Sequence, residues 1–91
     1  MLLNPQMNIK IYVSPENHWC NELKTWLKKK RYPFELHDLD ESTTARDELL
    51  RKSNQMAIPM IDIDGEIVIG FHPEKIETII ISRKSWNKTN N

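Results

Sequence analysis

The fold of this chain is decided by residues 9–20, Ile9-Lys10-Ile11-Tyr12-Val13-Ser14-Pro15-Glu16-Asn17-His18-Trp19-Cys20, because the structural period changes within them. Residues 9–13 are mainly β-branched or aromatic and nearly alternate, which predicts a strand. Pro15 cannot donate to a sheet, so the strand ends before it. Asn17 is a good helix N-cap. The apolar residues that follow recur at helical spacing and predict a helix with Cys20 in its first turn: Cys20, Leu23 and Leu27.

Two further elements follow this first strand and helix. After Pro33, the partial alternation over residues 34–39 predicts a second strand. Acidic residues and Ser42 then offer cap candidates for a helix over residues 43–53. Its predicted packing residues are Ala45, Leu49 and Leu50.

The last third of the chain contains a hairpin signal. Residues 60–63 and 66–69 are two apolar runs joined by Asp64-Gly65, the dipeptide that a type I′ turn favours. Pro73 suits the first turn of a final helix. The predicted buried face of that helix is formed by Ile76, Ile79 and Ile80.

The element order is therefore βαβαββα. A strand, a helix and a second strand imply a right-handed crossover and a parallel pair. The hairpin adds antiparallel strands to that pair. The sequence predicts an α/β fold in which three helices cover a mixed four-stranded sheet.

The charge and cysteine counts exclude several classes of function. The 91 residues carry 13 Lys and Arg against 13 Asp and Glu, so the net charge is zero and binding to nucleic acid or a membrane surface through bulk charge is not expected. The single cysteine excludes an internal disulfide and a metal centre built on several thiolates from this chain. We expect no metal site, and a free thiol in the reducing cytoplasm.

The length indicates one small domain. We expect a flexible N-terminal extension over residues 1–6, a domain over residues 7–85 and a polar C-terminal tail over residues 86–91. We expect neither a secretion signal nor a membrane span in residues 1–6, and we expect the functional start to be either Met1 or Met7. We expect a monomer.

Four short segments resemble the glutaredoxin family of the thioredoxin superfamily. Residues 14–20 resemble its T-x-P-x-C-x-x-C segment, residues 57–59 its cis-proline segment and residues 63–66 its hairpin. Residues 70–76, Gly-Phe-His-Pro-Glu-Lys-Ile, are most similar to the NrdH-redoxins, the glutaredoxin-like electron donors of ribonucleotide reductase. The resemblance implies the thioredoxin-like (glutaredoxin) fold and thiol-disulfide exchange in cell redox homeostasis.

One position departs from the family pattern. The first, nucleophilic cysteine of the family falls on Asn17, and only the second, resolving cysteine is present, as Cys20. Because an amide cannot form a mixed disulfide, the ordinary dithiol cycle is excluded. Cys20 is either a reactive thiol acting alone or a small core hydrophobe, and both interpretations stay open.

The resemblance also implies a groove beside a cis Pro59. Its predicted residues are His18, Trp19, Ile58, Pro59, Phe71 and His72. The Ile58 backbone would face an extended peptide or glutathione. Glutathione is not supported by the Gly70-Phe71-His72-Pro73 turn, which has one glycine and lacks an amide donor at Pro73, so no cofactor is expected.

Two main functions follow from these residues. The first is a glutaredoxin-like thiol redox protein with an atypical N-x-x-C site that acts through Cys20 on a protein or small-molecule thiol or disulfide. The second is a redox-inactive binding module that recognises a peptide or protein in the groove beside Pro59. A third function is suggested by a resemblance to the thioredoxin-like domain of glutathione transferases, with Asn17 at the position that binds the glutathione thiolate. We expect it least of the three, because the helical second domain that carries the other substrate in those enzymes is not expected here.

Overall fold

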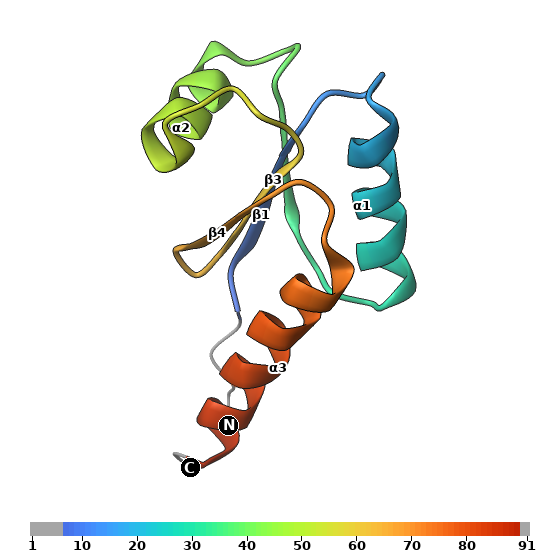
Figure 1. Cartoon of the computed structure of the whole chain (residues 1–91), viewed down its shortest axis with the longest axis vertical. Coiled ribbons are helices and arrows are strands. Elements are labelled where there is room, and N and C mark those ends of the chain that lie inside the picture. The colour runs from blue at the N-terminus through green and yellow to red at the C-terminus, as the bar shows by residue number, and fades with distance from the viewer. Residues whose placement is uncertain (1–6, 90–91) are drawn as a thin grey trace.

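A central sheet of four strands carries three helices in the computed structural model, which describes the backbone of residues 7–89 and the side chains of residues 7–83 (Figure 1). The elements are β1 (Ile9–Val13), α1 (His18–Lys29), β2 (Glu35–Asp38), α2 (Thr43–Ser53), β3 (Met60–Ile63), β4 (Glu66–Ile69) and α3 (Pro73–Thr89). This is the predicted order βαβαββα. The predicted extension over residues 1–6 lies outside the described residues, as do residues 90–91 of the predicted tail.

The strands lie in the order β2-β1-β3-β4. Strand β1 is parallel to β2, with Ile11 opposite Leu36, and antiparallel to β3, with Ile11 opposite Ile61. Strands β3 and β4 form the antiparallel hairpin. The predicted parallel pair and hairpin are therefore both confirmed.

The hairpin turn follows from its two central residues. Asp64 has a φ of 51° and Gly65 a φ of 97°. A type I′ turn requires positive φ at both central positions, and the Asp-Gly dipeptide satisfies this at little steric cost. The turn joins β3 and β4 directly and fixes their register.

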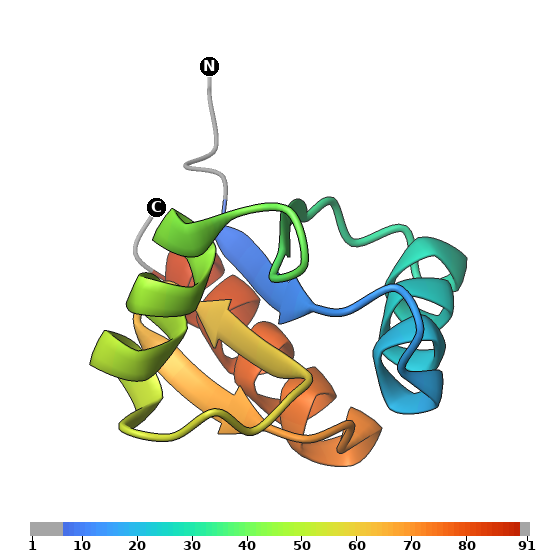
Figure 2. The same ribbon diagram turned by 90° about the horizontal axis from the view of Figure 1, so that it is seen from above.

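Both faces of the sheet are covered, α1 and α3 packing on one side and α2 on the other (Figures 1 and 2). Alternation along β1 sends neighbouring side chains to opposite faces. Ile11 and Val13 enter the core under α1 and α3, and Tyr12 enters the core under α2. This arrangement places the N-terminus of α1 directly after the buried strand β1.

One detail differs from the sequence prediction. Leu49 is fully buried, but Leu50 is 43% exposed, because consecutive residues are about 100° apart around a helix. The prediction that Leu50 packs in the core was therefore wrong. The backbone of α3 continues to Thr89, and residues 84–89 contain no glycine or proline that would break a helix.

Candidate functional site

The N-terminus of α1 is capped by Asn17. This residue has extended backbone angles, φ −89° and ψ 126°, and its Oδ1 accepts a 3.0 Å hydrogen bond from the backbone N–H of Cys20. Asparagine is among the preferred N-cap residues because its side chain satisfies one of the unpaired amides of the first turn. The Asn17 side chain is therefore engaged in capping α1.

The loop before α1 is fixed by further hydrogen bonds. The backbone N–H of Asn17 donates to the carbonyl of Ser14 at 3.1 Å, and Nδ2 of Asn21 donates to the carbonyl of Pro15 at 3.1 Å. The Ser14 hydroxyl is 3.1 Å from a carboxylate oxygen of Asp40, which follows β2. These contacts tie the loop to α1 and to the segment after β2.

Cys20 lies inside the core rather than at the surface. Its side chain is fully buried, and its Sγ accepts a 3.5 Å hydrogen bond from the backbone N–H of Ser14. Burial raises the pKa of the thiol above its ordinary value; the Ser14 N–H and Lys24 act in the opposite direction, and Asp40 adds to the increase. At neutral pH Cys20 is therefore a protonated thiol without solvent access.

The proline segment before β3 packs beside the turn that leads to α3. The Ile58–Pro59 peptide bond is cis. Pro59 is buried, and its carbonyl accepts a 2.7 Å hydrogen bond from the backbone N–H of Gly70. Ile58 is half-buried and packs against both hydrophobic cores, including the cluster that contains Cys20. The structure thus joins two segments that the sequence assigned to one groove.

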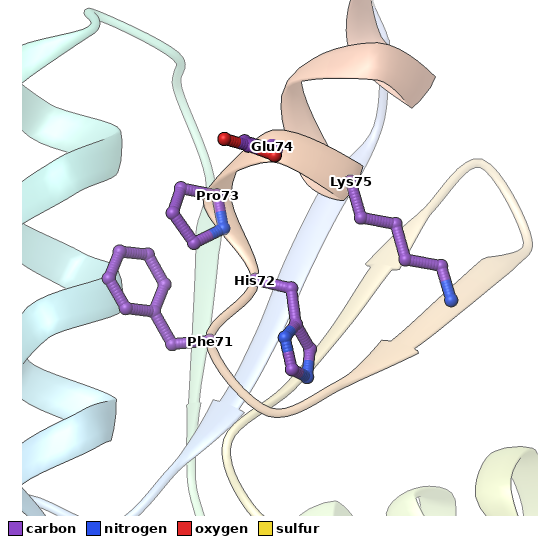
Figure 3. A pocket seen from close by; sticks show the side chains of 5 residues that line it. All are labelled: Phe71, His72, Pro73, Glu74 and Lys75. Atoms are coloured by element: carbon purple, nitrogen blue, oxygen red, sulfur yellow. The ribbon is translucent and has the colours of Figure 1, made fainter.

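Phe71 and His72 point in different directions from that turn (Figure 3). The Phe71 ring turns toward α1, where its centroid is 6.2 Å from that of Trp26. His72 is exposed, and its Nε2 lies 3.0 Å from the position that a Cβ on Gly70 would occupy. Gly70, with a φ of 91°, therefore leaves room for the imidazole as well as for the turn.

His18 and Trp19 form an exposed aromatic pair in the first turn of α1. Their ring centroids are 4.8 Å apart in an edge-to-face arrangement, and Trp19 is 55% exposed. Among the side chains that the structure describes, no ring contact joins Trp19 to Phe71. Trp19 thus presents an apolar surface outside the core, whereas Phe71 contributes to the packing of α1.

An open hollow of about 540 Å³ lies at the start of α3 (Figure 3). It is lined by Phe71, His72, Pro73, Glu74 and Lys75. Pro73 is the first residue of the helix and has no N–H, so it removes one of the amide donors that a helix N-terminus offers an anion. The hollow combines a phenyl ring with one acidic and two basic side chains.

A polar cluster under α2 was missed by the sequence analysis. The Lys52 ammonium donates to Oδ2 of Asp62 at 2.6 Å and to the Tyr12 hydroxyl at 2.7 Å, and that hydroxyl donates to Glu48 at 2.8 Å. The only sequence signal is Asp62 within the apolar strand segment over residues 60–63. The cluster lies on the face of the sheet opposite the Cys20 core.

No group of three or more His, Cys, Asp or Glu side chains within the described residues is arranged to hold a metal ion. No helix within residues 7–89 combines the length and apolar composition needed to cross a bilayer.

The sequence is similar to proteins described as glutaredoxins or glutaredoxin-like. The chain is 36% identical over 72 residues to a glutaredoxin-like 8.6 kDa protein of the rubredoxin operon of Clostridium pasteurianum, covering 79% of this chain and 96% of that protein. It is 27% identical over 63 residues to glutaredoxin 3 of Escherichia coli K12, covering 69% of this chain and 76% of that protein.

Solved structures agree with these sequence relatives. The thioredoxin-like protein BC3987 superposes with a TM-score of 0.73 at 32% identity, over 78% of this chain and 97% of that one. The NrdH-redoxin of Escherichia coli shares the fold, with a TM-score of 0.68 at 24% identity over 79% and 93% of the two chains. The sequence model of the glutaredoxin family matches residues 9–68. The chain therefore belongs to the glutaredoxin family, with the thioredoxin-like fold of that family.

Proposed function

We propose that this protein binds an extended segment of a thiol- or disulfide-bearing partner beside Pro59, and that it does not itself run a dithiol exchange cycle. In a dithiol cycle, an accessible thiolate at the first cysteine position forms a mixed disulfide, which the second thiol then resolves. Asn17 has no sulfur, and Cys20 is fully buried with a raised pKa. These two observations support binding without turnover.

The main observation that supports this proposal is that the backbone N–H and C=O of Ile58 form no hydrogen bond with the described part of the chain. The residue is half-buried and lies just before β3, next to a proline that is hydrogen-bonded to Gly70. A free donor and acceptor in this setting suit an extended chain that adds to the edge of the segment. Exposed Trp19 would supply apolar contact to such a chain.

Thiol-disulfide exchange through Cys20 alone is the second candidate. Its support is the Ser14 N–H, which donates to Sγ and stabilises a thiolate. The thiolate would attack one sulfur of a partner disulfide, form a mixed disulfide and release the other sulfur as a thiolate. A solution thiol such as glutathione would then attack the mixed disulfide and return Cys20 to the reduced state. The first turn of α1 must open for this to occur, because Sγ is buried.

A binding titration tests the first proposal. The probe is a short peptide dimer bridged by one cystine, titrated into ¹⁵N-labelled protein. We expect shifts at Trp19 and Ile58, retained affinity in Cys20→Ser, and affinity about five- to tenfold lower in Trp19→Ala, as for loss of an aromatic contact. Leu50→Ala is the matched control, since Leu50 is similarly exposed but lies on α2. Absence of shifts at Ile58 at millimolar peptide would refute binding at this surface.

A kinetic assay separates the two candidates. Reduction of hydroxyethyl disulfide by glutathione is followed with the native chain and with Cys20→Ser. If the protein only binds its partner, both the native chain and Cys20→Ser should give the uncatalysed background rate of reduction. A native rate above background that Cys20→Ser abolishes would instead establish exchange through Cys20 and overturn the claim that the chain lacks turnover.

A further inference from the structure

A second hollow, of about 510 Å³, lies between the C-terminal half of α1 and the first turns of α3. Its lining residues are Trp26, Lys30, Pro73, Glu74, Glu77 and Thr78. The three that follow Pro73 on α3 are spaced i, i+3 and i+4 and therefore share one face of that helix. The hollow combines an indole ring, two carboxylates and a hydroxyl, which together suit a cationic group with an apolar face.

The hollow already holds one cation of the protein itself. The Lys30 ammonium lies 5.7 Å from the centroid of the Trp26 ring and 3.2 Å from Oε1 of Glu77. The ring and the carboxylate can therefore receive the same positive charge. Lys30 is the C-cap residue of α1 and its side chain is 45% exposed, so solvent screens this ion pair and it is weak. A better-fitting cation could displace it.

The two groups that receive the charge are held in position. The Tyr32 hydroxyl donates to Oε2 of Glu77 at 2.6 Å, and this hydrogen bond is the main cause that raises the pKa of Tyr32 to about 12. The Trp26 ring packs edge-to-face against Tyr32 at 6.0 Å and against Phe71 at 6.2 Å. A ligand therefore meets a carboxylate and an indole that lose little conformational freedom on binding.

Glu74 adds a second carboxylate to the hollow. Its side chain is exposed and forms no ion pair with any side chain that the structure describes. The carboxylate of Glu74 is thus available at the rim for a second contact to an incoming cation.

We propose that this hollow binds an arginine side chain of a protein partner, whose guanidinium stacks on Trp26, pairs with Glu74 and Glu77 and displaces Lys30. Arginine fits better than lysine because its planar guanidinium stacks on aromatic rings and offers several donors to carboxylates. A single arginine contact of this kind is weak, so a short peptide binds only at high concentration, and a protein partner, which adds further contacts, is favoured over free arginine. The inference goes beyond the proposed function and does not require it.

The first test is a titration of ¹⁵N-labelled full-length protein with acetyl-Gly-Arg-Gly-amide, followed through the indole N–H resonance of Trp26. We expect a saturable shift. The same peptide with citrulline has the same shape but no charge, and we expect no saturable shift from it. Equal shifts from both peptides, or no shift at Trp26 with the arginine peptide, would overturn the proposal.

Variants test the roles of individual side chains. Glu74→Gln lowers the affinity about threefold, and Lys30→Met raises it about threefold because the internal competitor is removed. Lys29→Met is the matched control: it removes the same charge from an exposed neighbour that does not line the hollow. An equal gain from Lys29→Met and Lys30→Met would show bulk charge only and reject the site. Trp19→Ala leaves this titration unchanged, so failure here is distinct from failure of peptide binding beside Pro59.

Discussion

Asn17 accepts a 3.0 Å hydrogen bond through its Oδ1 from the backbone N–H of Cys20, three residues along the chain. In the alignment that we propose, these two positions correspond to the nucleophilic and the resolving cysteine of the glutaredoxin family. Here the first has become the cap of α1 and the second a core residue. The Asn17 side chain therefore contributes to the stability of α1 through this cap.

Restoring the nucleophile is expected to create activity. Asn17→Cys places a thiol at the N-terminus of α1, where the helix dipole and the free amides lower its pKa. We expect reduction of hydroxyethyl disulfide by glutathione to rise from the background rate. Asn17→Ser is the control, since serine also caps helices but brings no sulfur. A folded Asn17→Cys protein that stays at the background rate would argue against the alignment of residues 17–20 with the family site.

The capping role of Asn17 predicts an ordered series of stabilities. Asn17→Ala removes the acceptor of the Cys20 N–H and is expected to lower the free energy of unfolding by about 1 kcal/mol. Asn17→Asp retains an acceptor and adds a negative charge at the positive end of the helix dipole, so it should match or exceed the native stability. Urea unfolding measures both. Equal losses in Asn17→Ala and Asn17→Asp would contradict the capping role.

The buried thiol predicts a pH dependence of stability. Because burial raises the pKa of Cys20 above its ordinary value of 9.0, the folded chain keeps a proton that the unfolded chain releases. This contribution to stability is complete below pH 9.0 and is lost as the pH rises through the folded pKa. The unfolding free energy of the native chain should therefore fall relative to that of Cys20→Ala as the pH rises above 9.0, by at most about 1.4 kcal/mol per pH unit.

Taking the difference from Cys20→Ala cancels the contributions of the other groups that titrate in this range. Tyr12 and Lys52, whose pKa values are also raised, are present in both proteins. In the same experiment, alkylation of the native thiol by iodoacetamide should be slower than in the urea-unfolded chain. A constant difference in stability across the range, together with fast alkylation of the folded chain, would show that the thiol is accessible.

Local sequence signals predicted most of the fold. The change of period between Val13 and Asn17 located the first strand and helix, and Asp64-Gly65 located the hairpin turn. Each signal is short-range, because a turn or cap depends on residues close in sequence. Leu50 was misplaced since an apolar residue next to a core position looks like part of the core until the helix phase is known.

Contacts between distant residues were not predictable in the same way. Tyr12 and Lys52 are 40 residues apart, and Tyr32 and Glu77 are 45 apart. Each residue alone is compatible with a solvated surface, and only the packed sheet and helices bring the pairs together. The hollow at Trp26 likewise depends on how α3 lies against α1. Sequence motifs gave the position of Asn17 and Cys20, but not the depth at which Cys20 is buried.

Of the polar contacts, we expect removal of the Lys52–Asp62 ion pair to lower the free energy of unfolding the most. Burial lowers the pKa of Lys52, but its bonds to Asp62 and Tyr12 outweigh this and raise the pKa overall, so the ammonium stays charged. Asp62 is only 8% exposed. Lys52→Met leaves its carboxylate without a cation and should lower the free energy of unfolding by about 1–3 kcal/mol. This is less than for a fully buried pair, because the Lys52 side chain keeps 27% exposure.

Two further variants test whether this loss comes from the unpaired carboxylate. Arg51→Met removes a neighbouring exposed charge and should change the stability by less than about 0.5 kcal/mol. Adding Asp62→Asn to Lys52→Met removes the stranded charge and should recover part of the loss, since the amide oxygen can still accept from the Gly65 N–H. If Lys52→Met costs no more than Arg51→Met in urea unfolding, the pair is solvated and the cluster does not hold α2 on the sheet.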